Sequence, residues 1–238
     1  MAEPVVLSLP AEARRLDTVP ISEHVYRVIR DAICEGKFEP YTRLVQNQIA
    51  EQLEVSRTPV RDSLLRLSQE GLIDSVGARG YIVRKLTPRD ILDVYEVRLT
   101  LEVKASDMSL DLLSAADFGK LRQLQAEIAL PEAHPSDYYE LNRQFHEALI
   151  APCSNKLLGH LIEEIWNLPV SRLIFRQYVS SWASIEKMVK EHQEILDAAV
   201  AGDRERYLHL VAEHMRNAKE DTSAWLETEY APEETAGA

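Results

Sequence analysis

The chain has 238 residues, of which 45% are hydrophobic and 28% are charged, a composition typical of folded proteins rather than of disordered chains. No run of about 18 apolar residues occurs, which excludes a membrane-spanning helix, and the first residues lack the basic-then-apolar order of a secretory signal. The formal net charge of −12 is unevenly placed, because residues 1–86 hold 12 basic and 12 acidic residues and the rest hold 15 and 27.

The segment up to residue 53 predicts two helices. Residues 1–19 show no clear period and are expected to be flexible. Apolar residues then recur at helical spacing over residues 21–36, where a glycine ends the pattern. A short segment over residues 37–44 leads to a second helix over residues 46–53, after which a tight turn is expected.

A third helix and a β-hairpin are expected next. Ser56 or Thr58 caps the third helix, which ends at Gly71. Two short strands over residues 72–76 and 81–84 are joined by the turn Gly-Ala-Arg-Gly. Three helices followed by a small hairpin are the order of a winged helix-turn-helix, so we assign residues 20–86 to a DNA-binding domain.

The sequence from Thr87 to residue 227 predicts only helices. Thr87, followed three residues later by Asp90, is typical of the N-terminal cap of the first of them. The fold class is therefore mainly α: the winged domain is followed by an all-α bundle of six or seven helices over residues 87–227. We expect helices at about 88–110, 114–130, 136–150, 154–167, 170–179, 184–201 and 203–227, with a break at Gly202 and caps at Ser114, Ser136, Ser154, Ser184 and Asp203. The acidic tail over residues 228–238 is expected to be disordered.

The third helix has the two faces that a DNA-recognition helix needs. Val60, Leu64 and Leu67 form an apolar stripe that seats the helix. The remaining positions carry donors that can reach base edges or phosphates, namely Arg57, Thr58, Arg61 and Arg66, while Arg79 lies at the tip of the hairpin. Arginines on a helix often interact only with water. The interpretation of this helix as a DNA-recognition helix therefore depends on the whole order of three helices and a hairpin, and not on the arginines alone.

The stretch from LVQNQIAEQLEVSRTPVRDSLLRLSQEGLI to GARGYIV resembles the DNA-binding domain of the GntR family. The resemblance implies DNA contacts from Ser56, Arg57, Thr58, Arg61, Arg79 and Gly80. Asn47 stands where the family often has a basic residue, which puts one contact in doubt. Helix-turn-helix proteins read palindromic half-sites as dimers, so a homodimer on double-stranded operator DNA is expected.

Three histidines lie on apolar stripes of three different predicted helices of the C-terminal part. They are His146, His192 and His214, and Asn142 lies one turn before the first. A buried imidazole needs a hydrogen bond or a metal ion, and each histidine alone is most simply a hydrogen-bonded core residue. Three in one domain indicate a site for a divalent metal such as Zn or Ni, with Cu and Fe also suited to imidazole.

The segments VYEVRLTLE, NRQFHEALI and KEHQEILDAAVAGD are similar to the helical ligand-binding FCD domain of the FadR subfamily. The resemblance implies that Asn142, His146, His192 and His214 hold the metal. The family often has Asp at the first of these positions, and a neutral amide is expected to weaken the site. A small carboxylate effector would fill the open metal positions, and Arg98 either anchors that carboxylate or forms a salt bridge with Glu96, Glu102 or a neighbouring helix.

Three functions are compatible with these features. The first is a cytoplasmic transcription regulator, expected to be a repressor, whose operator affinity changes when a small organic acid binds. The second is a metal-dependent helical enzyme that uses the three histidines, with Glu147 and Glu191 beside them; it lacks a placed general base and gives the winged domain no purpose. The third is a domain that the metal only stabilises. The distant Cys34 and Cys153 are expected to be reduced thiols.

Overall fold

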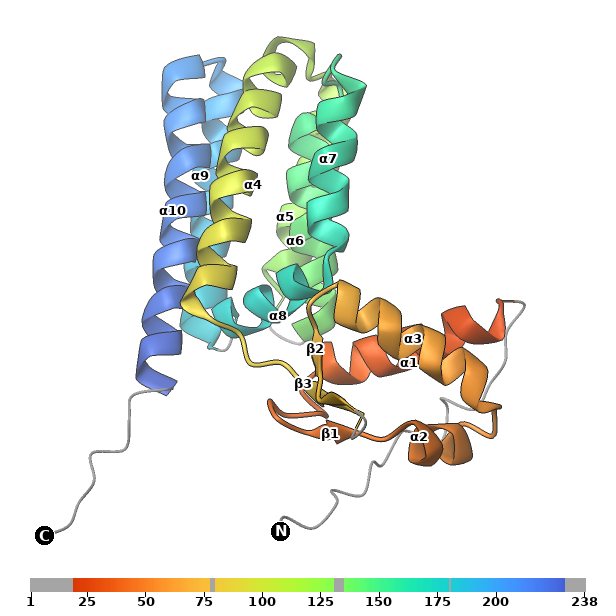
Figure 1. Cartoon of the computed structure of the whole chain (residues 1–238). Coiled ribbons are helices and arrows are strands. Elements are labelled where there is room, and N and C mark those ends of the chain that lie inside the picture. Colours follow the sequence, from red (N-terminus) through yellow and green to blue (C-terminus); the bar gives the residue numbers. More distant parts are fainter. Residues whose placement is uncertain (1–18, 78–79, 131–134, 180, 230–238) are drawn as a thin grey trace, which may run out of the picture. The chain divides into compact units, whose positions relative to one another are not determined.

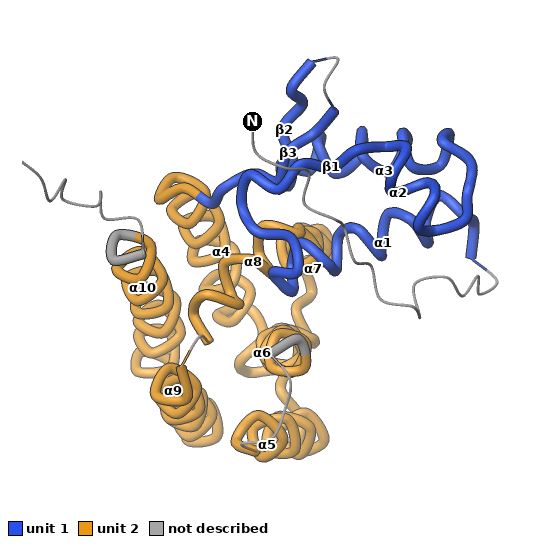
Figure 2. Tube along the Cα trace, turned by 90° about the horizontal axis from the view of Figure 1, so that it is seen from below, with its two compact units in different colours: residues 1–86 blue, residues 87–238 orange. Residues whose placement is uncertain are grey.

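The structure is a computed structural model that divides into two compact units, residues 1–86 and residues 87–238 (Figure 2). It describes residues 19–77, 80–130, 135–179 and 181–229. Arg79 and nearly all of the two expected flexible ends lie outside these ranges. At the C-terminal end the last helix continues to Glu229, two residues beyond its expected end. Within the described ranges, no helix combines the length and apolarity that crossing a membrane requires.

The first unit places three helices and three short strands around one apolar core (Figure 1). α1 and α3 pack against each other, and α2 packs on α3. The helices come together because each buries an apolar stripe, and Val25, Ile29, Ile49 and Leu64 are completely buried. The elements are α1 (Ile21–Cys34), β1 (Arg43–Leu44), α2 (Gln46–Gln52), α3 (Arg57–Gln69), β2 (Ile73–Ser75) and β3 (Tyr81–Val83).

The sheet has one strand more than the sequence predicts. The expected hairpin is formed by β2 and β3, but β1, which we expected to be a connecting segment, pairs antiparallel with β3. The strand order is β1-β3-β2. A two-residue strand has no periodicity of its own, and its structure comes from the partner strand, so sequence alone does not reveal it.

The second unit is a bundle of seven α-helices, as the sequence predicts. Seen end-on in Figure 2, α4, α7, α6, α5, α9 and α10 follow one another in a ring, and each helix packs on the next. α8 contacts four of them at one end of the bundle. The elements are α4 (Pro88–Ser109), η3 (Leu110–Leu112), α5 (Ala115–Ile128), α6 (Pro135–Ile150), α7 (Lys156–Asn167), α8 (Pro169–Tyr178), α9 (Trp182–Ala201) and α10 (Arg204–Glu229).

The helix ends confirm some of the expected caps and correct others. Thr87 and Ser114 each form a capping box, and Gly202 ends α9 in the left-handed conformation. Ser154 and Ser184 are not caps, because Asn155 and Ser181 take those positions. In both cases another residue that can cap a helix lies within three positions of the predicted one. The exact first residue of a helix is therefore not fixed by residue type alone. The structure also contradicts the cap at Ser136, because α6 already begins at Pro135.

Candidate functional site

The first part of α3 presents an exposed polar face. Val60 and Leu64 on its inner face are completely buried. Ser56, Arg57 and Thr58 are exposed on the other side. Ser56 stands at the N-cap position, yet its hydroxyl makes no capping hydrogen bond. The N-terminus of α3 therefore combines unpaired backbone N–H groups with polar side chains, which suits it to bind phosphate.

The two arginines at this end are only weakly held by the protein. The Arg61 guanidinium lies 3.2 Å from the Asp62 carboxylate, and both side chains are more than half exposed. No ion pair of Arg57 occurs within the described residues. Asn47 is exposed on α2. Exposed ion pairs contribute little, so these side chains remain available to a nucleic acid.

Arg66, expected to project toward DNA, is instead held within the first unit. Its guanidinium lies 2.8 Å from the Glu23 carboxylate of α1 and 3.0 Å from the Glu70 carboxylate. It also lies 3.6 Å from the centre of the Tyr26 ring, whose hydroxyl donates to Glu70. These contacts connect α1 and α3, so the geometry favours a structural role for Arg66 over base readout.

The hairpin requires glycine at Gly80. This residue has φ of +104°, and a Cβ atom there would lie 2.9 Å from the Leu44 carbonyl oxygen. Both the conformation and the close approach exclude larger residues without a shift of the backbone. Gly80 therefore fixes the shape of the turn between β2 and β3. Arg79, expected at the tip of this turn, is not among the described residues.

The second unit brings together the three histidines that the sequence singles out. His146 lies on α6, His192 on α9 and His214 on α10, and each is at most 3% exposed. Their nearest ring nitrogens lie within 4.8 Å of one another. The His192 and His214 Nε2 atoms are 3.3 Å apart. Two imidazole nitrogens bound to one ion at about 2.1 Å would lie roughly 3.0–3.4 Å apart, so this pair needs almost no movement to share an ion.

Two carboxylates fix the orientation of two of these rings. Glu102 of α4 lies 2.8 Å from His146 Nδ1, and Glu191 lies 2.6 Å from His214 Nδ1. Burial lowers the pKa of His146 to about 4, although Glu102 acts in the opposite direction. The neutral ring donates its Nδ1–H to Glu102, which leaves the Nε2 lone pair facing the other histidines. Carboxylates behind imidazoles are the usual second partners of metal-binding histidines.

Two buried side-chain atoms of α6 lack a hydrogen-bond partner. His146 Nε2 and Asn142 Oδ1 are buried and have no hydrogen-bond partner. Buried polar atoms are nearly always satisfied, so these two orphaned acceptors, one helical turn apart on α6, require an explanation. A cation supplies one, because every one of these atoms carries a lone pair. The donor set of one amide oxygen and three nitrogens fits Zn or a similar divalent ion.

Arg98, the candidate effector anchor, is buried against the same cluster. Its Nε lies 2.7 Å from Glu102, and its guanidinium stacks 3.6 Å from the centre of the Trp166 ring. Burial alone would raise the pKa of Glu102, but Arg98 and His146 together lower it to about 2. This is the salt bridge that the sequence left open as an alternative. The Arg98 Nη2 atom contacts the sulfur of Met215, a weak acceptor, at 3.8 Å.

Sequence reasoning did not assign Glu102 and Glu191 their roles. Glu102 was considered only as a partner of Arg98, and Glu191 only as a neighbour of His192. The signal available was spacing: Glu102 lies one turn after Arg98, and Glu191 directly precedes a buried histidine. Glu191 also accepts a hydrogen bond from Asn217 and lines a surface cavity of about 220 Å³ between α9 and α10, which His214 reaches from inside. This cavity therefore borders the cluster at His214.

Comparison with known proteins agrees with both units. Residues 21–83 match the bacterial regulatory proteins of the gntR family, and residues 93–217 match the FCD domain. The HTH-type transcriptional repressor RspR of Escherichia coli is 24% identical over 230 residues, which cover 93% of this chain and all of that protein.

Solved structures with the same architecture include a putative GntR transcriptional regulator from Rhodococcus sp. RHA1. It has a TM-score of 0.69 and 25% identity, and the match covers 84% of this chain and 96% of that one. McbR/YncC of Escherichia coli shares the fold with a TM-score of 0.64 at 22% identity, over 89% of this chain and all of the other. The matched relatives are transcription regulators and not enzymes. With a gntR-type helix-turn-helix and an FCD domain covering more than half of its length, the chain belongs to the GntR family of transcription regulators.

Proposed function

We propose that this regulator represses transcription from a palindromic operator and that a small organic acid, bound at a metal centre in the second unit, changes its affinity for that operator. The observation that supports this most is the buried cluster of three histidines with Asn142, because two buried acceptors of this set, His146 Nε2 and Asn142 Oδ1, have no partner within the protein. The relative RspR is named a repressor, which supports the direction of control.

In the proposal, the operator is contacted by the N-cap and first turns of α3, through Ser56, Arg57, Thr58 and Arg61. Asn47 adds a contact from α2. In the same proposal, Arg79 and Gly80 add contacts to the operator. Exposure and weak internal pairing support these assignments for α2 and α3. Arginine can donate two hydrogen bonds to a guanine edge, whereas the hydroxyl groups and the helix N-terminus suit phosphates.

The metal would be held by Asn142 Oδ1 and by the Nε2 atoms of His146, His192 and His214. When bound, such an ion supplies a Lewis-acidic centre with open positions that a carboxylate can occupy. Glu102 and Glu191 orient two of the rings. Arg98 has donors that are not saturated by Glu102, which supports a second contact to the carboxylate of the effector.

A helical domain that the metal only stabilises is the main competitor, and the enzyme interpretation loses support from the relatives. The test starts by selecting fragments of genomic DNA that bind the protein at physiological salt. Operator affinity is then measured for metal-loaded and chelator-treated protein with a panel of hydroxy acids, dicarboxylates and sugar acids. A shift that needs both metal and acid supports the proposal; metal binding without any shift supports the competitor.

A further inference from the structure

A surface groove of about 700 Å³ lies between α5 and α9 of the second unit. Its volume is within the usual range of small-molecule sites in proteins. The residues that line it from α9 lie on a different face of that helix from His192, so the groove is separate from the histidine cluster.

The two helices of the groove run antiparallel. α5 begins at the end of the bundle where α4 finishes, and α9 begins at the opposite end, next to α8 (Figure 1). The side-chain amide of Gln125 on α5 donates to the Val189 carbonyl oxygen on α9, so these two residues are level with each other. Their contact marks the middle of the groove, and the lining residues on either side of it define two ends.

One end of the groove is cationic. Arg122 lies one turn before Gln125 on α5, and Lys190 follows Val189 on α9, so both residues lie toward the same end. Arg122 is exposed, and in the described part of the chain it forms no ion pair. The ion pair of Lys190 with Glu194 is long, at 3.9 Å, and the lysine side chain is 79% exposed. Both charges are therefore available to an anion.

The other end of the groove is apolar. Ala129 lies one turn after Gln125, and Trp182 lies at the start of α9, about two turns before Val189. The Trp182 indole is 41% exposed, and its Nε1–H donates to the Glu186 carboxylate at 2.7 Å, which orients the ring. An exposed indole beside a small alanine offers a stacking partner to a planar aromatic ring.

The middle of the groove holds an unsatisfied acceptor. Gln125 lines the groove although the residue is only 6% exposed. Its amide nitrogen is engaged by Val189, but its Oε1 atom is buried and has no hydrogen-bond partner. Buried amide oxygens are nearly always bonded, so a ligand that brings an N–H or O–H group to this atom would satisfy it.

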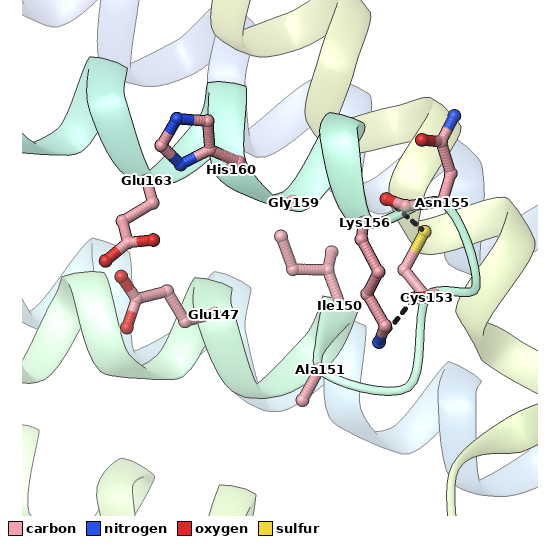
Figure 3. A pocket seen from close by; sticks show the side chains of 9 residues that line it. All are labelled: Glu147, Ile150, Ala151, Cys153, Asn155, Lys156, Gly159, His160 and Glu163. Carbon is pink, nitrogen blue, oxygen red and sulfur yellow. Dashed lines mark hydrogen bonds between the residues drawn. The ribbon is translucent and has the colours of Figure 1, made fainter.

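The cavity between α6 and α7 is acidic instead (Figure 3). The carboxylates of Glu147 and Glu163 face each other across it. Burial raises the pKa of Glu147, and the charge of Glu163 acts in the same direction. Lys156, the lysine of this cavity, donates to the Cys153 carbonyl oxygen at 3.1 Å. This cavity therefore disfavours an anion, whereas the groove between α5 and α9 favours one.

We propose that the groove between α5 and α9 binds a planar aromatic carboxylate that also carries an N–H or O–H donor. The carboxylate pairs with Arg122 and Lys190, and the ring stacks on Trp182. The donor reaches Gln125 Oε1. This site needs neither the metal nor the histidines, so it goes beyond the proposed function and does not depend on it.

The test is isothermal titration calorimetry of the full-length protein with indole-3-acetate, which has all three groups. Chelator-treated wild type and His192→Ala are both titrated, because the proposed metal centre also takes carboxylates. We expect one molecule per chain and the same dissociation constant in both proteins. In chelator-treated protein, Arg122→Gln should weaken binding about three- to tenfold and Trp182→Ala about tenfold. Arg216→Gln, which changes an exposed arginine of α10, is the matched control and should bind like the wild type.

Three further ligands test the chemical class. Indole-3-acetamide lacks the charge, 1-naphthaleneacetate lacks the N–H donor, and octanoate lacks the ring. Each should bind at least about threefold more weakly than indole-3-acetate, because each loses one of the three contacts. Equal or tighter binding of any of them overturns the contact that it lacks.

Far-ultraviolet circular dichroism of each variant shows whether its helices are intact. No binding at millimolar indole-3-acetate, or wild-type affinity in folded Arg122→Gln and Trp182→Ala proteins, overturns the site. Binding that appears only in the metal-loaded wild type would also overturn it, and would place the carboxylate at the histidine cluster instead.

Discussion

The exposed face of α3 and the histidine cluster of the second unit differ in how their polar side chains are held. Arg57 and Arg61 extend into solvent with at most one weak partner. His146 and His214 are buried, and each has a carboxylate behind it that fixes the ring. A surface that must adapt to DNA can leave its donors mobile, whereas a site that must select an ion needs its ligands preorganised. The two units therefore respond differently to substitution.

The largest effect is expected from His192→Ala. The substitution removes one of the three imidazole donors of the cluster, so metal content measured by mass spectrometry should fall from a full complement to a small fraction. Operator affinity without effector should be unchanged, because the residue lies in the second unit. His160→Ala, which changes an exposed histidine on α7, is the matched control and should keep its metal. Retained metal in His192→Ala would contradict the ligand assignment.

Arg57→Ala should act on the other unit alone. If Arg57 reads a base, the loss is about 1–3 kcal/mol, or roughly 5–150-fold in the operator dissociation constant. Fluorescence anisotropy with the selected operator and with a scrambled duplex separates lost specificity from lost charge. Arg89→Ala removes an exposed arginine of α4 and should change neither value. An equal loss on both duplexes would show that Arg57 contacts only phosphate.

Glu191→Gln should weaken metal binding by about 10–100-fold without abolishing it, because it loosens the His214 ring but removes no ligand. Competition with a fluorescent chelator measures the change. The variant keeps the side-chain volume, and thermal unfolding of the metal-free protein should be close to that of the wild type. Unchanged metal affinity would mean that the Glu191–His214 contact serves packing alone.

The smallest effect is expected from Arg66→Ala. Its ion pairs are half-exposed and contribute little, so the main loss is the stacking on Tyr26, about 1 kcal/mol or less. Thermal unfolding should show a slight destabilisation, and operator affinity should change far less than in Arg57→Ala. A specific loss of operator binding in a stable protein would restore Arg66 to the DNA-reading face.

The elements that sequence predicts well are those with a local signal. The apolar period of Val60, Leu64 and Leu67 places α3, and the Thr87 capping box places the start of α4. The histidine cluster was predictable because each ring lies on the apolar stripe of its own helix, and helices of one bundle turn such stripes to a common centre.

The features that were missed depend on residues distant in sequence. β1 exists only because β3 lies beside it. The contacts of Arg66 with Glu23 and Tyr26 join α1 to α3 across some 40 residues. Glu102 reaches His146 from another helix, and its spacing from Arg98 predicts only the local salt bridge. Pairing across elements is set by packing, which no periodicity encodes.

The central claim is that occupancy of the buried cluster controls DNA affinity. The most direct test measures operator binding of metal-loaded wild type and of His192→Ala during titration with the acid that gives the largest response. We predict a change in the wild-type dissociation constant of about 5–150-fold, the usual range of coupling between sites, and no change in His192→Ala. The same shift in both proteins, or none in the metal-loaded wild type, would contradict the account.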